Sequence, residues 1–566
     1  MLACAQPDLI FFSSALPLTQ PKTMFDHISR LLTNGYNSPQ GLAPWYFLPA
    51  VGNANYDIRF PYLSSTPLEY YQYTGALDNT GAAGASTFAG CTTINGDNDV
   101  TGQAYKCTNA AFLNSGDTAW ILTSCALVLF MSIPGLALYY SGLVRQANVL
   151  TTSMQTLSIT CFITFMWFFC GYSLSFAPTN PYRKTSTPIY GDGSRLWFRG
   201  MKYDTAHVLA PTIPETVYCL YQLTFAIITP ALICGSFADR MKYWPMVLFM
   251  ILWHVTVYCP LAHANWHPDG FLFQSGSLDF AGGNVVHISS GIAGLVSVAI
   301  VGNRRGFNQP AEKDNFLPSN ILTTFTGAMM LWVGWLGFNG GAAGSAGLMA
   351  GQAVLNTHLS AATGAITWML TEVIFSPDHK PKFLGMTSGV IAGLVGVTPG
   401  AGFMDQNGAF WSGFFAGILC YFGAQLKHYL GYDDALDAFG VHAIGGIVGG
   451  ISVGFFATRS VGSYHAGFEK MHLGAPGVSN RDGVYYSNLE HGGTQLGVQI
   501  YAIVVAIGWS AFMSAILLLA IDKTLGLRVS AQDEDTGLDD SIHGESLAPK
   551  ESKPYTGVSE TEMTTA

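Results

Sequence analysis

The sequence predicts an all-α polytopic membrane protein, with eleven transmembrane helices arranged as two inverted five-helix repeats plus a final helix. Two observations indicate the membrane class. Charged residues make up only 11% of the 566-residue chain, against about 25% in soluble domains, and 49% of the residues are hydrophobic. A third observation, a histidine motif that occurs twice, indicates the repeat.

The eleven helices correspond to apolar runs of the length that a bilayer requires, roughly 20 residues. Several runs contain Gly or Pro, which membrane helices tolerate because neighbouring helices satisfy the freed backbone groups. The predicted spans are 118–142, 148–176, 216–237, 242–262, 280–302, 319–340, 351–375, 384–402, 407–426, 437–457 and 494–521.

Basic residues mark one side of the membrane. Alternate short loops carry Lys or Arg, whereas the short loops 263–279, 341–350 and 403–406 carry none. By the positive-inside rule the basic loops are cytoplasmic, so an odd number of spans places the N-terminus outside the plasma membrane and the C-terminus inside. The basic residues are Arg145, Arg240, Lys242, Arg304, Arg305, Lys313, Lys380, Lys382 and Lys427.

Three regions result: an extracellular N-terminal segment at 1–116, a membrane domain at 117–521 and a cytosolic acidic tail at 522–566. We expect the tail to be partly disordered towards its end. In the first segment, Cys91 and Cys107 are candidates for a disulfide bridge, which their spacing alone does not establish. Because the formal charge is −10 and no basic stripe is present, nucleic acid is not an expected partner.

A shared pattern, Val-His-x-x-x-Gly-Ile-x-Gly, begins at Val286 and again at Val441. Its histidines, His287 and His442, fall on the fifth and tenth predicted spans. A repeat of five spans forces the second copy to lie upside down in the bilayer, and inverted repeats place their working site near the midplane. The alternative is a chance match between two glycine-rich packing motifs.

Ionisable side chains inside spanning helices are costly, so each one is a candidate functional group. If His287 and His442 face each other, one ring nitrogen donates a hydrogen bond and the other accepts it. Apolar surroundings disfavour the imidazolium form, so we expect neutral rings that offer no stable seat for a cation. Asp279 and Asp437 each precede a glycine-rich helix, where a carboxylate caps free N–H groups.

Several stretches resemble the ammonium transporter (Amt/Mep/Rh) family. The most specific is the run Asp-Phe-Ala-Gly-Gly-Asn-Val-Val-His from Asp279 to His287, and together with Trp266 it favours the Amt/Mep branch. The resemblance covers about residues 116–546. Its other stretches are 116–120, 134–142, 334–340, 439–442 and 537–545.

The resemblance implies roles for residues at the outer mouth. Trp266 corresponds to a tryptophan of an external ammonium site, and Phe225 and Phe338 correspond to two stacked rings that close the pore mouth. Tyr221 stands where a Phe is common, one turn before Phe225. Asp279 is expected to add its negative field to this site.

The resemblance also implies roles deeper in the pore. His287 and His442 correspond to the family's twin pore histidines, and Trp335 and Asn339 are expected to line the channel near them. One position departs from the family. Ala342 stands where a Ser often follows the Asn and helps to hold the cation, so we expect an altered outer site but an intact pore.

Two free energies, the cost of desolvating ammonium and the gain from cation–π contacts, decide which species crosses the membrane. Moving a bare ammonium ion into an apolar pore costs tens of kcal/mol, whereas cation–π contacts return about 0.5 to 2 kcal/mol. We therefore expect ammonium, or methylammonium as its analogue, to bind outside, lose its proton and cross in neutral form. The proton is free to travel separately along the paired imidazoles, and potassium is expected to be excluded.

Two alternative functions remain open: an ammonium sensor with little flux, and a membrane enzyme with histidine-ligated haem or metal. The enzyme would leave the mouth motifs unexplained. The resemblance instead implies a non-enzymatic homotrimer in the lipid bilayer, without cofactor, whose tail docks on the cytosolic face. Thr536, Ser541 and Ser546 are candidates for phosphorylation by a regulatory kinase, and a regulatory protein is a further candidate partner of the tail.

Overall fold

The computed structural model divides into two units, residues 1–43 and 44–566. The described residues belong to the second unit: 113–177, 187–207, 209–311, 316–462, 482–486 and 489–547, with the backbones of the short strands β1 (Ile58–Arg59), β2 (Gln72–Tyr73), β3 (Cys91–Thr93) and β4 (Tyr105–Cys107). These strands pair antiparallel, β1 with β2 and β3 with β4, and the second pair sets Cys91 opposite Cys107. Their side chains lie outside the described part of the chain, so the disulfide bridge stays a prediction.

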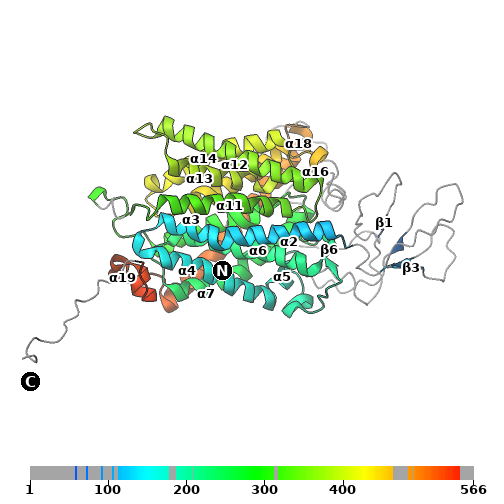
Figure 1. Cartoon of the computed structure of the whole chain (residues 1–566), viewed down its shortest axis with the longest axis horizontal. Coiled ribbons are helices and arrows are strands. Elements are labelled where there is room, and N and C mark those ends of the chain that lie inside the picture. Colours follow the sequence, from blue (N-terminus) through cyan, green and yellow to red (C-terminus); the bar gives the residue numbers. More distant parts are fainter. Residues whose placement is uncertain are drawn as a thin grey trace, which may run out of the picture. The chain divides into compact units, whose positions relative to one another are not determined.

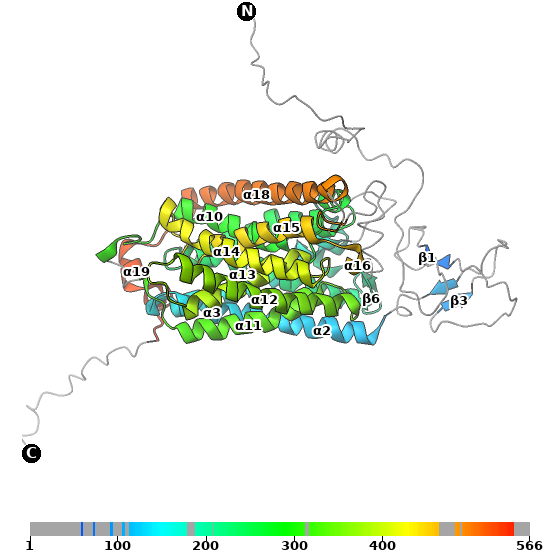
Figure 2. The same cartoon turned by 90° about the horizontal axis from the view of Figure 1, so that it is seen from above.

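The described residues form eleven helical spans. The helices lie side by side, which confirms the predicted all-α membrane fold (Figure 1, Figure 2). Their ends agree with the predicted bounds to within about five residues. In order they are α2 (Ser115–Phe130), η2 (Met131–Gly135) and α3 (Leu136–Leu143); η3 (Gln146–Asn148), α4 (Val149–Met166), η4 (Trp167–Gly171) and α5 (Tyr172–Phe176); α6 (Glu215–Phe237); α7 (Tyr243–Trp253), η6 (His254–Tyr258) and α8 (Cys259–Trp266); η7 (Gly283–Ile288) and α10 (Ser289–Val301); α11 (Ile321–Gly341); α12 (Leu348–Phe375); α13 (Phe383–Val397) and η9 (Thr398–Gly400); α14 (Gln406–Leu430); η10 (Phe439–Ala443) and α15 (Ile444–Phe456); and α18 (Leu489–Leu525).

One span is less apolar than the rest. Among the described residues, ten helices have both the length and the hydropathy of a membrane span. The eleventh, α12, is 28 residues long but buries polar side chains, including Asn356 and Thr357. It packs against α11, α13 and α14, so its polar face meets protein.

Short elements lie at the two ends of the bundle. At one end are η5 (Gly193–Phe198), the antiparallel pair β5 (Ala206–His207) and β6 (Ala210–Pro214), α9 (Phe271–Gln274) and α16 (Arg459–Gly462). At the other end are the tail helices α19 (Ala531–Thr536) and α20 (Leu538–His543). Figure 1 shows β6 and α19 at these opposite ends.

Both histidine motifs have the same local structure. Each begins with a π-helical segment, η7 or η10, and each continues into an α-helix of 13 residues, α10 or α15. Such segments are rare and often occur at functional sites. The described residues form three other π-helical segments, η2, η4 and η6, so the repeat is supported by the shared sequence pattern and by the equal 13-residue helices that follow.

The two motifs cross where glycines replace side chains. A Cβ atom on Gly291 would collide with the backbone of Ala443, and a Cβ atom on Gly446 would lie 3.1 Å from the Cβ of His287. In lipid, helix association depends on close packing, which small residues allow. These glycines therefore set the distance between the two helices that carry the histidines.

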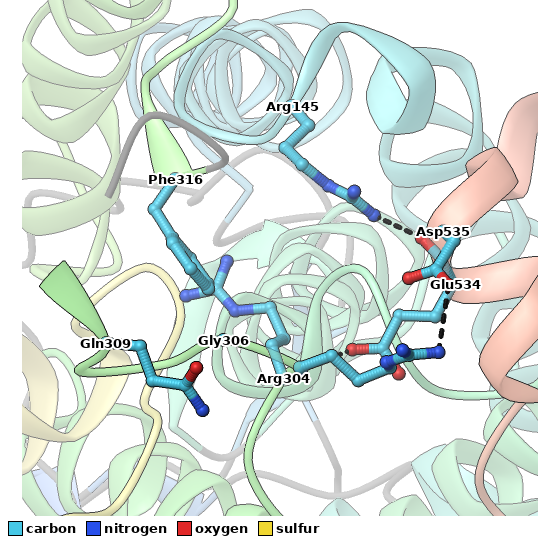
Figure 3. Close-up of a pocket in the computed structure, with 8 residues that line it drawn as sticks. Arg145, Arg304, Gly306, Gln309, Phe316, Glu534 and Asp535 are labelled. Carbon is cyan, nitrogen blue, oxygen red and sulfur yellow. Dashed lines mark hydrogen bonds and ion pairs between the residues drawn. The ribbon is translucent and has the colours of Figure 1, made fainter. Parts of the chain in front are cut away.

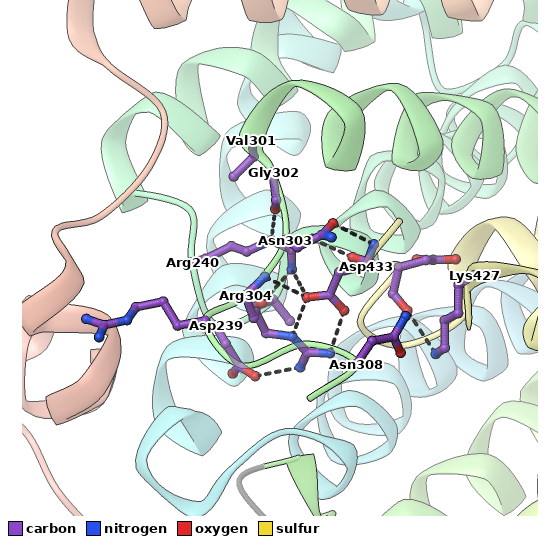
Figure 4. Close-up of polar contacts among 12 residues, drawn as sticks. Asp239, Arg240, Val301, Gly302, Asn303, Arg304, Asn308, Lys427 and Asp433 are labelled. Carbon is purple, nitrogen blue, oxygen red and sulfur yellow. Dashed lines mark hydrogen bonds and ion pairs between the residues drawn. The ribbon is translucent and has the colours of Figure 1, made fainter. Parts of the chain in front are cut away.

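Buried charges join the loops that follow α6, α10 and α14 (Figure 4). Arg304 donates to both carboxylate oxygens of Asp433 at 2.8 Å and to Asp239 at 3.0 Å. Arg240 donates to the backbone carbonyl of Asp433 at 2.5 Å. Burial raises the pKa of Asp433, but the guanidinium of Arg304 outweighs it and lowers that pKa to about 2.

Replacement of Gly291 by Ala is expected to destabilise the protein by about 1 to 3 kcal/mol, the usual cost of overpacking. The reason is that the new methyl group has no space beside Ala443. Thermal unfolding of the purified protein in detergent measures the effect. Gly508→Ala is the control, because nothing lies within 4 Å of a Cβ at that position. Equal melting temperatures for the two variants would contradict the packing argument.

Replacement of Asp433 by Asn is expected to cost about 3 to 5 kcal/mol, because Arg304 loses its main buried partner. The folded pKa lies below the ordinary value of 3.8, so the carboxylate's contribution is complete above about pH 4 and is lost as the pH falls toward about 2. The difference in melting temperature from wild type should shrink over that interval. Asp535→Asn, which removes an exposed ion pair with Arg305, should have little effect.

Candidate functional site

The twin histidines meet in the interior of the bundle. Nδ1 of His287 lies 3.3 Å from Nδ1 of His442, and the two ring planes are 12° apart. Both side chains are buried, with exposed fractions of 1% and 4%. One ring must carry its proton on Nδ1 and donate it to the other, which fixes both tautomers. The facing pair that the sequence predicts is therefore present.

An indole ring covers one face of this pair. Trp335, on α11, stacks on His287 with ring centroids 5.4 Å apart and planes 15° apart. Its Nε1 donates a hydrogen bond to Oγ1 of Thr398 at 2.8 Å. Nε2 of His287 is buried and has no hydrogen-bond partner. This nitrogen is free to interact with a small polar molecule.

Two stacked aromatic rings lie next to the histidines. Phe225 on α6 and Phe338 on α11 stack at 4.2 Å with planes 27° apart, and Phe338 lies 6.3 Å from His287. Tyr221 contacts the edge of Phe225 and donates through its hydroxyl to the carbonyl of Phe338 at 2.6 Å. The hydroxyl that distinguishes Tyr221 from Phe thus joins the two helices that carry the stacked rings.

Trp266 forms the outer wall of the aromatic cluster. Its ring lies edge-on to Phe225 at 5.7 Å, and its Nε1 donates to the backbone carbonyl of Asp279 at 2.7 Å. Phe176, at the end of α5, stacks on Trp266 at 6.3 Å with planes 13° apart. The sequence analysis did not identify Phe176. The only available signal was its position at the end of an aromatic-rich span.

Asp279 has a structural role in addition to its charge. Its carboxylate accepts hydrogen bonds from the backbone N–H groups of Gly282, Gly283, Asn284 and Val285, at 2.5 to 3.3 Å. Burial raises the pKa of this carboxyl above its ordinary value, although the four donors oppose the shift. The side chain therefore caps η7, as predicted, and both of its oxygens face backbone donors.

The second predicted cap is assigned to the wrong residue. Asp437 forms an ion pair with Lys427 at 2.6 Å, with a backbone φ of +59°. Asp434 instead accepts a hydrogen bond from the N–H of Phe439, at the start of η10, at 2.7 Å. The sequence could not separate these carboxylates, because they lie only three residues apart, five and two residues before the helix start.

Asn339 and Ala342 follow the stacked rings on α11. Asn339 donates to Oγ1 of Thr357 at 2.9 Å, and its side-chain oxygen is buried without a partner. Ala342 is the C-cap residue of α11, and its N–H donates to the carbonyl of Asn339. The methyl group at this place supplies no hydroxyl ligand.

The acidic tail docks on the loops at one end of the bundle. Both carboxylate oxygens of Asp539 accept hydrogen bonds at the start of α4, from the N–H of Leu150 at 3.0 Å and of Thr151 at 2.7 Å. Leu538 N–H donates to the side chain of Asn148 at 2.7 Å. The tail thus caps the second span, and residues 548–566 lie outside the described part.

A cavity of about 430 Å³ is lined jointly by the tail and the basic loops (Figure 3). Arg145 donates to the backbone carbonyl of Glu534 at 2.6 Å, and Arg305 pairs with Asp535 at 2.8 Å. The cavity is lined by Arg145, Arg304, Arg305, Gly306, Gln309, Phe316, Glu534 and Asp535. The tail therefore lies on the same side of the bundle as the first three basic loops.

Over the described residues, no group of three or more His, Cys, Asp or Glu side chains is placed to hold a metal ion. Between Trp266 and His442 the structure places mainly aromatic rings, followed by two imidazoles that bind each other. Such a lining suits a small neutral solute that forms few hydrogen bonds.

Comparison with known proteins agrees with this geometry. The profile of the Ammonium Transporter Family matches residues 119–547. An ammonium transporter of Aquifex aeolicus is 40% identical over 450 residues, which are 78% of this chain and 96% of that protein. Ammonium transporter 1 of Schizosaccharomyces pombe is 36% identical over 437 residues, 77% of this chain and 82% of that protein. The crystal structure of Saccharomyces cerevisiae Mep2 matches with a TM-score of 0.66 and 32% identity, over 75% of this chain and 89% of that one. This chain therefore belongs to the ammonium transporter (Amt/Mep) family.

Proposed function

We propose that this protein transports ammonium by binding the cation at the outer aromatic cluster, removing its proton, and passing ammonia between the aromatic rings and the twin histidines. One observation carries the proposal. The rings follow one another from the mouth to the interior: Trp266 contacts Phe225, Phe225 stacks on Phe338, Phe338 approaches His287, and His287 faces His442. Ring-centroid distances along this series are 4.2 to 6.3 Å.

The chemistry of the lining favours the neutral species. The outer rings offer a cation about 0.5 to 2 kcal/mol through cation–π contacts, whereas complete desolvation of an ion costs tens of kcal/mol. Asp279 adds a negative field, but its oxygens already accept four backbone hydrogen bonds. A cation is therefore attracted to the mouth and stopped there, and potassium, which has no proton to release, goes no further.

The histidine pair offers a separate path for the released proton. Nε2 of His287 is unpartnered, and its Nδ1 faces Nδ1 of His442. When a proton arrives at Nε2 of His287, the proton on its Nδ1 passes to His442, and His442 releases a proton from its own Nε2. Ammonia and the proton then cross separately, and the net transport carries charge.

The basic loops and the tail share one side of the bundle, which supports a cytosolic tail and an outward N-terminus in a plasma membrane. Arg145 and Arg305 both contact the tail. A homotrimer in the lipid bilayer follows from the family resemblance. In this arrangement the docked tail is the element on which a kinase or a regulatory protein acts.

Replacement of His287 by Ala is expected to reduce the ammonium-evoked current by about a hundredfold, the lower range for loss of a positioned proton-transfer group. Current recorded from a reconstituted bilayer measures this loss. His358→Ala is the control, because His358 is exposed on α12. A current that survives in the His287 variant would exclude the proton path. A wild-type protein that binds methylammonium without flux would identify a sensor instead.

Replacement of Asp539 by Ala is expected to release the tail from α4, since loss of a capping carboxylate costs about 0.5 to 2 kcal/mol. If the docked tail holds the conducting state, methylammonium uptake falls. Asp540→Ala is the matched control, because this neighbouring side chain is exposed. Equal uptake by both variants, at equal amounts in the membrane, would remove the tail from the regulation of flux.

A further inference from the structure

Three histidines surround the C-terminal end of α5, close to the outer aromatic cluster. A helix end leaves its last carbonyl groups without helical partners. Here His263 places Nδ1 3.0 Å from the carbonyl oxygen of Ser175, and His207 places Nε2 2.9 Å from that of Phe176. His267 stacks on His263 at 4.3 Å with planes 16° apart. All three rings are buried, with exposed fractions of 0 to 1%.

His207 is satisfied as a neutral ring. Its Nε2–H donates to the carbonyl of Phe176, and its Nδ1 accepts a hydrogen bond from the N–H of Leu209 at 3.1 Å. One proton on the ring serves both contacts. Burial lowers the pKa of His207 to about 4, which agrees with this neutral form.

His263 faces a different pair of partners. Its Nδ1 lies 3.0 Å from the carbonyl oxygen of Ser175, and its Nε2 lies 2.9 Å from the carbonyl oxygen of Thr187. Carbonyl oxygens only accept hydrogen bonds, so both contacts form only when both ring nitrogens carry protons. A neutral ring makes one of these bonds and sets a lone pair against the other carbonyl.

Three other titratable groups lie around His263 in the described part of the chain. The carboxylate of Asp269 favours a charged His263 ring. Positive charges on the stacked rings of His263 and His267 oppose each other, but His267 accepts from the N–H of Asp269 at 3.2 Å and so has a neutral form available, and His207 from β5 is neutral too. The contacts from α5 and from Thr187 are backbone carbonyls. The carbonyl end of a helix dipole also favours a cation.

The ring stands next to the ammonium site. His263 and Trp266 are three residues apart on α8. Ser175, which His263 binds, is followed by Phe176, which stacks on Trp266. The hydrogen bond from His263 therefore holds the end of α5 against α8, and with it the ring that supports Trp266.

We propose that His263 is a positioning residue of the outer ammonium site, and that its second proton, taken up at acidic external pH, fixes Phe176 against Trp266. This proposal rests on the proposed function and orientation. As the external pH rises, the His263 ring loses one of its two hydrogen bonds. Phe176 is then held less firmly against Trp266, and the affinity for ammonium falls. The maximal rate, which depends on the pore, does not change.

The test measures KM and maximal rate for methylammonium uptake between about pH 5 and about pH 8 outside, the range in which histidine titrates. In wild type, KM is expected to rise about fivefold as the pH rises. This change is smaller than the full effect of losing a hydrogen bond to a charged group, because the lost bond acts on the ammonium site only indirectly, through Phe176. In His263→Gln, which cannot gain a proton, KM is expected to stay high at every pH with an unchanged maximal rate.

His207→Gln is the matched control. This variant loses a contact at the same helix end. Because the His207 ring that it replaces stays neutral over the tested pH range, the variant is expected to shift KM while keeping the wild-type pH dependence. A pH-dependent KM in His263→Gln would overturn the proposal. If that variant fails to reach the membrane, a flat KM in wild type overturns it equally well. Absence of any uptake by wild type would instead refute the proposed transport function.

Discussion

The structure depends on one constraint: ionisable side chains inside the bundle must form hydrogen bonds with protein groups without creating a binding site for an ion. The twin histidines meet it by binding each other, since His287 and His442 share a hydrogen bond between their Nδ1 atoms. Asp279 meets it by directing its carboxylate to four backbone N–H groups. An unpaired charge in these places would cost several kcal/mol. Beside these groups lie aromatic faces, the unpartnered Nε2 of His287 and the unpartnered side-chain oxygen of Asn339.

Close packing makes the histidine contact possible. The two motifs approach through Gly291 and Gly446, where a larger side chain would meet the opposite helix. Each histidine also lies in a π-helical segment, a feature that often occurs at functional sites. Because the glycines come from both motifs, the separation of the two rings is a property of the pair of helices and not of either one alone.

The sequence predicted the spans well because each is a local pattern of about 20 apolar residues. It predicted the twin histidines because the repeat marks them. It marked His263 only as an ionisable group at a helix end, and it could not identify Phe176 or His207, since the roles of these residues depend on contacts between distant spans. It also assigned the cap of η10 to Asp437, whereas Asp434 fills it, because a loop's path decides which of two nearby carboxylates reaches the helix. The low hydropathy of α12 is also explained only by tertiary contacts, because the neighbouring helices cover its polar residues Asn356 and Thr357.

The second span is held at both ends by groups that match its dipole. Asp539 of the tail accepts hydrogen bonds from the N–H groups at the start of α4, and imidazoles of His263 and His207 face the carbonyls at the end of α5. A carboxylate at the N-terminus and a potential cation at the C-terminus each stabilise a helix. Because this span also packs along α6, which carries Phe225, its position affects the stacked rings. If the two proposals hold, tail release on one side and loss of a proton on the other act on the same span, which packs against the helix that carries Phe225.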